Sequence, residues 1–345
     1  MKINMSCIRN WKVRMLEAIS IIAVGVAFFV SAPSLALSKE KDKVNFQWSW
    51  LPTGFYCPIS GGIAKGFYND VDIDLTVSTG RGSGDAVKKV AGGGSPIGDG
   101  DISAVMSARS RENAPVQCLM NIHHHSPHSL FVLKSSGIKG FKDLKGKTLA
   151  TTAGNSHRNY FPIAARMAGL DPDTVKWTVV DSTTMPAMLV NKRVDGVPYF
   201  TSNISFIKPQ VEARGDELVV IPFADYGFDI YSYCIYTRDD VIKEKPDMLR
   251  RFVAATQRSW LWASHNPEEA CRAHTKQWPD TKFKDNLAGW TDLRGNMFGK
   301  DLSRAWTGKF DMKRVQKTYD VLVKSQGLDP NFDVKQVIYD GLLPE

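Results

Sequence analysis

The sequence predicts an α/β protein made of two successive units of similar plan, and three observations lead to this fold class. Short runs of β-branched and aromatic residues alternate with helical stretches, which is the rhythm of proteins with parallel sheets. The rhythm starts near Val44, restarts after residue 152, and gives way to long amphipathic helices after residue 238. A chain of 345 residues that is 43% hydrophobic is also long enough for two domains.

The first unit alternates strands and helices from residue 44 onward. Runs rich in Val, Ile and aromatic residues predict strands over residues 44–50, 72–78, 95–101 and 116–124. Helical spacing between these runs predicts helices over residues 58–68, 84–92 and 102–110. This order predicts a βαβ arrangement around a parallel sheet.

The second unit repeats the plan and is followed by a helical region. Helices are expected over residues 156–170, 183–193 and 202–215, and strands over residues 175–181, 195–200 and 218–223. The amphipathic stretches at residues 245–266, 267–278 and 311–327 carry apolar stripes and terminal caps, which indicates a packing role.

Residues 1–36 have the features of a secretory signal peptide. Four basic residues precede a 13-residue apolar run that is short for spanning a bilayer. Small residues at Ser34 and Ala36 predict cleavage after Ala36. We therefore expect a soluble periplasmic product, since no cysteine follows closely enough for lipid attachment; a retained membrane anchor is the alternative.

Charge and cysteine content narrow the class of partner. Loss of residues 1–36 would remove four basic residues and Glu17, so the net charge would fall from +8 to +5. This mild charge argues against nucleic acid as a partner. The mature chain would keep Cys57, Cys118, Cys234 and Cys271. Their even number permits disulfides, their wide spacing assigns no pairing, and the default for each is a small buried hydrophobe.

Two strand-to-helix junctions are candidate ligand sites, because ligands of open α/β sheets bind at the carboxyl ends of strands. In the first, "IGDGD" carries Asp99 and Asp101 between glycines that would let a ligand approach backbone amides. A tight turn with Asp101 as the helix cap is the alternative. In the second, Asn155, Ser156 and His157 open a helix, where Asn155 can also serve as a cap.

Two further motifs are weak, and catalytic signatures are missing from the sequence. "GRGSGDAVKKVAGGG" lacks the ending of a nucleotide-binding loop and is expected to be a flexible junction. "HHHSPH", with His123, His124, His125 and His128, is expected to be a solvent-facing crossover, with metal binding as the alternative. The sequence has no nucleophile elbow, zinc-protease motif or Walker loop, so we expect no enzymatic activity and no cofactor.

Several stretches in order resemble one family. "WSWLPTGFYCPISGGIAKGFYNDVDIDLTV", "IGDGD", "SGIKGFKDLKGKTLAT", "AGNSHRNYFPIAARMAGL", "LVNKRVDGVPYF" and "EKPDMLRRFVAATQRSWLWASHNPEEA" together resemble substrate-binding proteins of ABC importers. The branch is that for nitrate, alkanesulfonates, taurine and thiamine-pyrimidine precursors. The resemblance implies a two-lobed periplasmic binding protein fold (type II) with a hinge. Lobe 1 would comprise residues 44–125 and 230–345, and lobe 2 residues 126–229.

The same fold is shared by the eukaryotic thiamine-pyrimidine synthase, and this chain departs from that enzyme at its motifs. The enzyme carries a Lys and a His four residues apart after the Gly-Asp strand, where Gly100 and Ala104 stand here. Its Cys-rich run is replaced by "FDIYSYCIY", which contains only Cys234. A Schiff base needs the missing amine, so the resemblance favours a binding protein over the enzyme.

The resemblance and the junctions together place eleven residues on an interlobe cleft. Along the first strand, Phe46 and Trp48 are expected in the core, whereas Trp50 emerges at the carboxyl end. The expected cleft residues are Trp50, Tyr56, Asp99, Asp101, Asn155, Ser156, His157, Tyr199, Asn203, Asp225 and Tyr226.

This set of side chains predicts the kind of cargo. Aromatic rings with acidic partners suit a planar nitrogen heterocycle similar to a thiamine-pyrimidine precursor. The alternative ligand is a small organic anion such as taurine or an alkanesulfonate. Its negative charge would be expected to pair with an Arg or Lys side chain, for which Arg158 is the one evident candidate. The resemblance implies a monomer that delivers the ligand to a membrane permease and, indirectly, its ATPase.

Overall fold

The first of two sheets contains the strand that leads to Trp50, next to one edge strand. The computed structural model describes residues 40–123, 125–299, 302 and 306–343, so the expected signal peptide and His124 lie outside the described residues. Residues 41–345 group into one compact unit. The strand order in the first sheet is β2-β1-β3-β10-β4. Its strands are β1 (Asp42–Gln47), β2 (Ile73–Ser78), β3 (Ile97–Asp101), β4 (Val116–Asn121) and β10 (Tyr233–Arg238).

The second sheet contains the strands between the first four and the last one. Its order is β7-β6-β8-β5-β9. The strands are β5 (His128–Leu133), β6 (Thr148–Thr151), β7 (Lys176–Val179), β8 (Gly196–Phe200) and β9 (Leu218–Pro222). Two crossovers, residues 122–127 and 223–232, therefore join the sheets. The α/β fold class inferred from the sequence is confirmed.

Each sheet is mixed, and this corrects the expectation of parallel sheets. β10 pairs antiparallel with β3 and β4, and β5 pairs antiparallel with β8 and β9. Along the chain, β5 is the first strand after one crossover and β10 is the first strand after the other. A chain that leaves the carboxyl edge of one sheet arrives at the carboxyl edge of the other, so its next strand runs against the parallel ones. The antiparallel strands follow from the crossovers.

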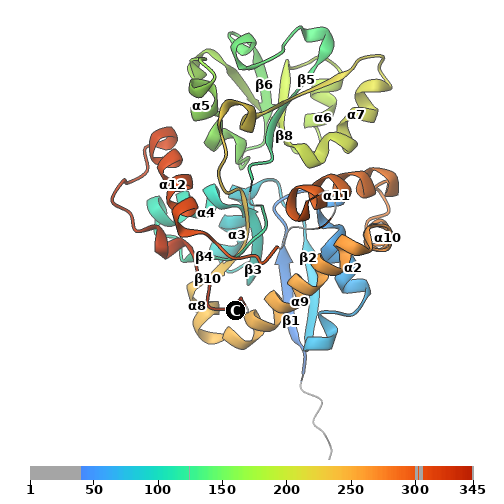
Figure 1. Cartoon of the computed structure of the whole chain (residues 1–345), viewed down its shortest axis with the longest axis vertical. Coiled ribbons are helices and arrows are strands. Elements are labelled where there is room, and N and C mark those ends of the chain that lie inside the picture. The colour runs from blue at the N-terminus through green and yellow to red at the C-terminus, as the bar shows by residue number, and fades with distance from the viewer. Residues whose placement is uncertain (1–39, 124, 300–301, 303–305, 344–345) are drawn as a thin grey trace, which may run out of the picture. The chain divides into compact units, whose positions relative to one another are not determined.

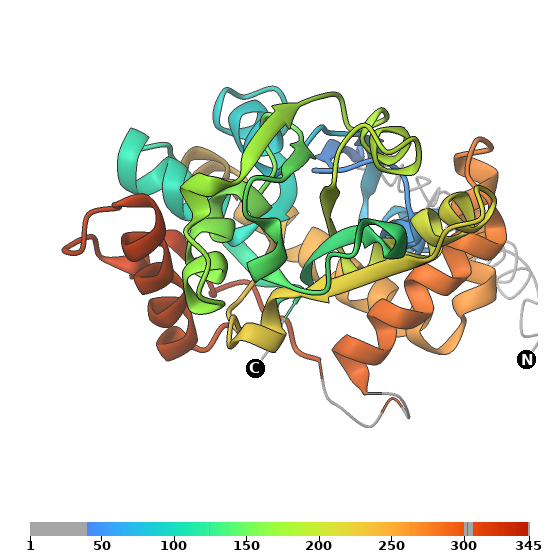
Figure 2. The same cartoon turned by 90° about the horizontal axis from the view of Figure 1, so that it is seen from above.

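Helices flank both sheets, and the carboxyl-terminal ones lie beside the first sheet. Figure 1 shows α5, α6 and α7 around the second sheet and α9 to α12, in orange and red, around the first; Figure 2 gives the view from above. The helices are α2 (Cys57–Ala64), α3 (Ser83–Ala91), α4 (Ile102–Glu112), α5 (His157–Met167), α6 (Met185–Val190), α7 (Ile204–Glu212), α8 (Asp239–Glu244), α9 (Pro246–His265), α10 (Pro267–Gln277), α11 (Phe283–Phe298) and α12 (Met312–Gln326).

Helix α11 is not among the helices expected from the sequence, and it contacts elements of both sheets. Its Gly289 and Gly295 weaken the helical pattern, because glycine lowers helix propensity by about 1 kcal/mol. The helix packs against η1 (Gly54–Tyr56) on one side and against η6 (Thr201–Asn203) and α7 on the other. A Cβ on Gly289 would lie 2.9 Å from the Ser202 carbonyl oxygen, so this glycine permits the close approach.

The four cysteines form two disulfides, Cys57–Cys271 and Cys118–Cys234. All four are fully buried, as expected. Their pairing could not be inferred from their spacing in the sequence. The first bond fastens α2 to α10, and the second joins β4 to β10, the strands that lead into one crossover and out of the other. The disulfides therefore hold carboxyl-terminal segments onto the first sheet.

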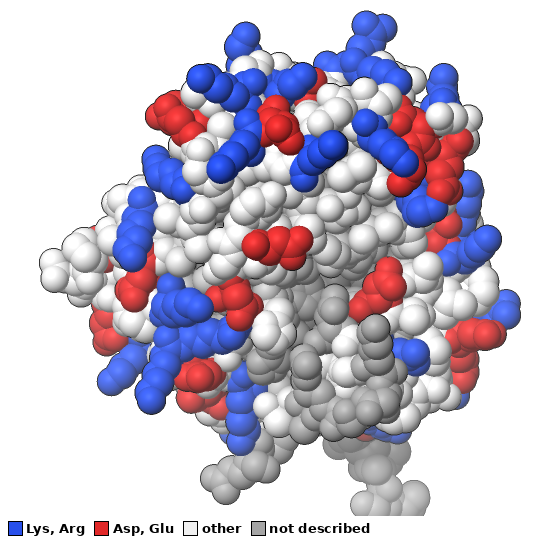
Figure 3. All heavy atoms as spheres, turned by 45° about the horizontal axis from the view of Figure 1, so that its top comes forward, with Lys and Arg blue, Asp and Glu red and all other residues white. Residues whose placement is uncertain are grey.

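The surface carries charges of both signs. On the face in Figure 3, Lys and Arg side chains are interspersed with Asp and Glu. Fifteen ion pairs join such groups within the described part of the chain, and most of them are exposed, so an exposed pair contributes little stability. Among the described helices, none is long and apolar enough to cross a membrane.

Candidate functional site

A small cavity lies where the carboxyl ends of strands from the two sheets meet. Its volume is about 50 Å³, well below the ~150 Å³ that holds a benzene ring in a protein core, so a ring-sized ligand requires the walls to separate. Seven of the eleven residues expected on the cleft line it: Trp50, Tyr56, Asn155, Ser156, His157, Tyr199 and Asn203. The structure thus places the second predicted junction on the cavity, whereas Asp99 and Asp101 of the first junction lie outside the lining.

The wall from the first sheet is formed by residues just after β1. The expected strand over residues 44–50 ends at Gln47, because Ser49 N donates to the Asp99 carboxylate (2.7 Å) instead of continuing the ladder. Trp48 is buried and stacks on Tyr56, with ring centroids 3.9 Å apart. Trp50 is half-buried at the cavity and meets Tyr199 of β8 edge to face at 6.2 Å. Trp50 and Tyr199 therefore contact each other across the two sheets.

Asp99 lies behind this wall, and one of its carboxylate oxygens accepts hydrogen bonds from three wall residues. Its Oδ1 accepts hydrogen bonds from Ser49 N (2.7 Å), the Tyr233 hydroxyl (3.1 Å) and the Tyr56 hydroxyl (3.3 Å). Burial raises the pKa of Asp99 to about 7, despite these bonds. Burial and then the charge of Asp99 raise the pKa of both tyrosines well above the ordinary value, so both hydroxyls stay protonated.

The wall from the second sheet presents the ring of His157. Asn155 Oδ1 accepts from His157 N (2.9 Å) and from His157 Nδ1 (2.8 Å). Because a backbone N–H can only donate, the Asn155 atom is its oxygen, and Nδ1 must carry the ring proton. Burial, and secondly the nearby His128, lowers the pKa of His157 well below its ordinary value. The ring is neutral, and Nε2 is a hydrogen-bond acceptor.

Three buried polar atoms on the cavity have no hydrogen-bond partner within the described protein. They are His157 Nε2, the Tyr199 hydroxyl and Asn203 Oδ1. Asn203 Nδ2 already donates to the Phe200 carbonyl (3.4 Å), which leaves the oxygen as the free acceptor. Each unpaired buried group costs about 1–3 kcal/mol. All three belong to residues that line the same cavity, which indicates a site that is completed by a ligand.

The glycine-rich segment contributes to the site, and its expected role as a flexible junction is wrong. Gly82 and Ser83 line the cavity, and Gly84 N donates to the Gly154 carbonyl (3.0 Å) from the second sheet's first junction. Gly82 has φ = 141°, and a Cβ there would lie 2.6 Å from the Gly154 oxygen. Glycine is required at this contact by both conformation and space.

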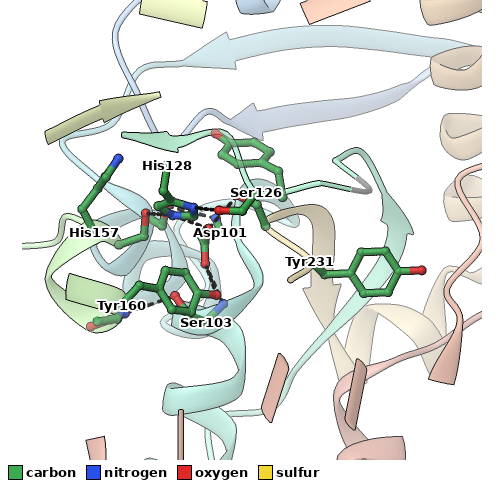
Figure 4. A network of polar contacts seen from close by, with 12 residues as sticks. Asp101, Ser103, Ser126, His128, His157, Tyr160 and Tyr231 are labelled. Carbon is green, nitrogen blue, oxygen red and sulfur yellow. Dashed lines mark hydrogen bonds and ion pairs between the residues drawn. The ribbon is translucent and has the colours of Figure 1, made fainter. Parts of the chain in front are cut away.

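A buried network lies next to the cavity and ties both crossovers together. The Asp101 and His128 side chains are fully buried, and Asp101 Oδ2 lies 3.1 Å from His128 Nε2 (Figure 4). Asp101 also accepts from the Tyr160 hydroxyl of α5 and from Ser232 Oγ, both at 2.8 Å. His128 packs against the His157 ring at 4.6 Å. Asp101 therefore supports the site from outside the lining.

At "IGDGD" the helix cap is confirmed, but the tight turn is not, because these residues form strand β3. Asp101 Oδ1 accepts from Ser103 N (2.9 Å) and caps α4. Gly98 and Gly100 lie within β3, where a Cβ would approach Tyr236 to 3.0 Å and Ser83 to 3.2 Å. The glycines therefore permit packing of the strand, and no ligand contact is needed to explain them.

The two residues expected at the return crossover lie away from the cavity lining. Asp225 is exposed in η7 (Phe223–Tyr226), and the Tyr226 ring packs edge-on against Phe141 at 4.9 Å. The neighbouring residue Phe223 is the buried one in this turn. We therefore leave Asp225 and Tyr226 out of the site.

The expectation of a solvent-facing histidine run is wrong for two of its members. His123 and His128 are buried, whereas His125 is exposed and lies 3.0 Å from Asp229. Among the described residues, no group of three or more His, Cys, Asp or Glu is arranged to hold a metal ion.

Nine further lining residues were not expected from the sequence: Ser49, Thr53, Phe55, Gly82, Ser83, Pro198, Phe200, Ser202 and Tyr233. Phe200 ends β8 and Tyr233 begins β10, so both lie at the same sheet edges as the predicted residues. For Phe200 and Tyr233, the position at a strand terminus was the available signal. No Lys, Arg, Asp or Glu lines the described cavity, and the Arg158 guanidinium lies over the Trp177 ring at 4.3 Å instead.

Two mixed α/β sheets joined by two crossovers, with a cavity at their carboxyl edges, are the periplasmic binding protein fold. The alkanesulfonate-binding protein SsuA from Xanthomonas axonopodis pv. citri, bound to MOPS, superposes with a TM-score of 0.69 at 10% identity, covering 88% of this chain and 99% of that chain. A family model described as NMT1/THI5 like matches residues 56–270, and the chain belongs to this family.

Two curated relatives have different activities in their names. A 4-amino-5-hydroxymethyl-2-methylpyrimidine phosphate synthase from Legionella pneumophila is 25% identical over 239 residues, which are 68% of this chain and 74% of the relative. The riboflavin-binding protein RibY from Chloroflexus aurantiacus is 22% identical over 259 residues, which are 74% of this chain and 72% of the relative. The resemblance inferred from the sequence is confirmed at the level of family and fold.

Proposed function

We propose that this protein is the extracytoplasmic solute-binding component of an ABC importer. It captures a small planar nitrogen heterocycle, similar to a thiamine-pyrimidine precursor, and delivers it to a membrane permease. One observation carries the proposal: His157 Nε2, the Tyr199 hydroxyl and Asn203 Oδ1 are buried without partners around an aromatic cavity.

The ligand chemistry follows from these three atoms. His157 Nε2 and Asn203 Oδ1 can only accept hydrogen bonds, so the ligand must supply N–H or O–H donors. Burial raises the pKa of Tyr199, so its hydroxyl stays protonated and can donate to a ring nitrogen. An aminopyrimidine edge combines amino donors with a ring acceptor, and its flat face suits Trp50 and Phe200.

Taurine or an alkanesulfonate is the second candidate, supported by the SsuA fold and by the start of α5 at the cavity. Charge argues against it, because the described lining holds no cation to pair with a sulfonate. The first amides of α5 are also engaged: His157 N donates to Asn155 Oδ1, and Arg158 N donates to the Asn155 carbonyl.

A pyrimidine-synthase activity is the enzymatic alternative, because several curated relatives carry that name. The described cavity offers no lysine amine for a Schiff base, and the matching positions are Gly100 in β3 and Ala104 in α4. We therefore propose binding without turnover and without a cofactor.

Location and partners are inferred from the same features. Disulfides Cys57–Cys271 and Cys118–Cys234 suit an oxidising compartment such as the periplasm. The division of the strands between two sheets supports lobes at residues 44–125 with 230–345 and at residues 126–229. We propose that these lobes close on the ligand as a monomer and present the closed form to the permease.

The test is a ligand screen of protein purified from the periplasm. We expect native mass spectrometry to retain a small heterocycle, and 4-amino-5-hydroxymethyl-2-methylpyrimidine to raise Tm more than taurine or nitrate does. Tyr199→Phe removes one hydroxyl and keeps the ring, so it should weaken pyrimidine binding about two- to tenfold. A larger shift with taurine, or conversion of pyridoxal phosphate, would overturn the proposal.

A further inference from the structure

A second and larger cavity adjoins the first at the junction between the two sheets. Its volume is about 460 Å³, and Thr53 and Ser202 line both cavities. Thr53 belongs to the segment before η1, and Ser202 lies in η6, so each sheet contributes one side of the shared wall. Only small polar side chains are shared by the two cavities.

Helix α11 holds this junction. Ser205 Oγ donates to the Asp285 carbonyl (3.1 Å), which joins η6 and α7 to the start of α11. A Cβ on Gly54 would lie 2.1 Å from the Asn286 carbonyl oxygen, so α11 also lies directly on the segment next to Thr53. The second cavity is therefore bounded by elements that contact both sheets, as the first is.

The two cavities differ in chemistry. The first is lined by aromatic rings and uncharged polar groups, whereas the second is lined by Asp280, Lys282, Asp285 and Gln210 among others. The lining of the second cavity carries two carboxylates and one ammonium group, so the formal net charge of the lining is −1. Such a lining suits hydroxyl groups and disfavours a phosphate.

We propose that the ligand has two parts, with its ring in the first cavity and a hydroxylated, uncharged substituent in the second. The ligand class is then a heterocycle that carries a sugar or polyol. This inference rests on the proposed function, since it assumes that the aromatic cavity binds a ring. The size of the cavities supports it, because the first one is narrow and most of the adjoining space lies beyond Thr53 and Ser202.

The experiment compares matched pairs of ligands by isothermal titration calorimetry on the full mature chain. The pairs are cytosine with cytidine, adenine with adenosine, and lumichrome with riboflavin, each with the corresponding monophosphate as a third member. For any ring that binds, we expect the sugar or polyol to tighten binding about tenfold, from two or more added hydrogen bonds. The phosphate should reverse this gain.

A filling variant tests where the substituent lies. Ala213 lines the second cavity alone, so Ala213→Trp should remove the tenfold advantage and leave the affinity for the bare ring unchanged. Ala187→Trp, at an exposed position of α6, is the matched control and should keep the advantage. Equal binding of ring and nucleoside, or tighter binding of the phosphate, would overturn this inference and leave the proposed function standing. If none of these rings and nucleosides binds while 4-amino-5-hydroxymethyl-2-methylpyrimidine does, this inference alone is overturned. If that pyrimidine fails to bind as well, both are overturned.

Discussion

Asp99→Asn should make the protein's stability less dependent on pH. In the wild type, all three hydrogen bonds to Asp99 end on Oδ1, which the asparagine oxygen can replace. The substitution therefore removes a buried ionisable group with little change in its contacts. Burial raises the pKa of Asp99 from the ordinary 3.8 to about 7, so the folded protein binds a proton more tightly there than the unfolded chain does.

The magnitude follows from that pKa difference. It corresponds to about 4 kcal/mol of stability, which is fully present below pH 3.8 and is lost as pH rises through about 7. About 3 kcal/mol of this lies between roughly pH 4.5 and pH 8. Urea unfolding of wild type and Asp99→Asn at both pH values measures this contribution. The change in unfolding free energy between the two pH values is compared for the two proteins, so the contributions of other titrating groups cancel. Exposed Asp225→Asn is the control. Parallel pH profiles of wild type and Asp99→Asn would refute the reasoning.

Three further predictions concern the walls, the network and the disulfides. Trp50→Ala and Tyr199→Ala should each weaken ligand binding by roughly 1–3 kcal/mol, measured by calorimetry; normal binding with lost stability would make the rings core residues. Asp101→Asn replaces the buried carboxylate that lies 3.1 Å from His128 Nε2 and accepts from Tyr160 and Ser232. It should lower the free energy of unfolding by about 1–3 kcal/mol in urea, whereas an unchanged midpoint would contradict a structural role for these contacts. The Cys57→Ser, Cys271→Ser double variant should lose about 2–5 kcal/mol, and equal stability of the wild type with and without reductant would refute a disulfide there.

Most of the fold could be predicted because its signals are local. Strand β2 and helix α4 lie close to their predicted ranges, since alternation and helical spacing are properties of neighbouring residues. Strands β5, β6 and β10 are not among the predicted ranges. The antiparallel direction of β5 and β10 was not predictable from local signals either, because it depends on where the crossovers deliver the chain. Helix α11 was missed because Gly289 meets a requirement of tertiary contact and weakens the local helical pattern.

The residues of the candidate site could be predicted where they lie near the end of a strand or the start of a helix. Trp50, His157 and Tyr199 all lie at such termini, and the rule of carboxyl strand ends is enough to find them. Gly82 was dismissed because its segment fits no nucleotide-binding motif, whereas its role is contact with Gly154 from the other sheet. The unpaired state of His157 Nε2 also depends on packing around the ring, so no sequence pattern contains it.

Two buried carboxylates on one face of strand β3 support the cavity walls, so they affect both ligand binding and the stability of the fold. Asp99 and Asp101 are two residues apart, so their side chains lie on the same side of the strand. Asp99 fixes the hydroxyls of Tyr56 and Tyr233 behind the first wall, while Asp101 holds His128, whose ring packs against His157 in the second wall. Substitutions in β3 should therefore change affinity and stability together, whereas a half-buried wall residue such as Trp50 should change affinity with less effect on stability.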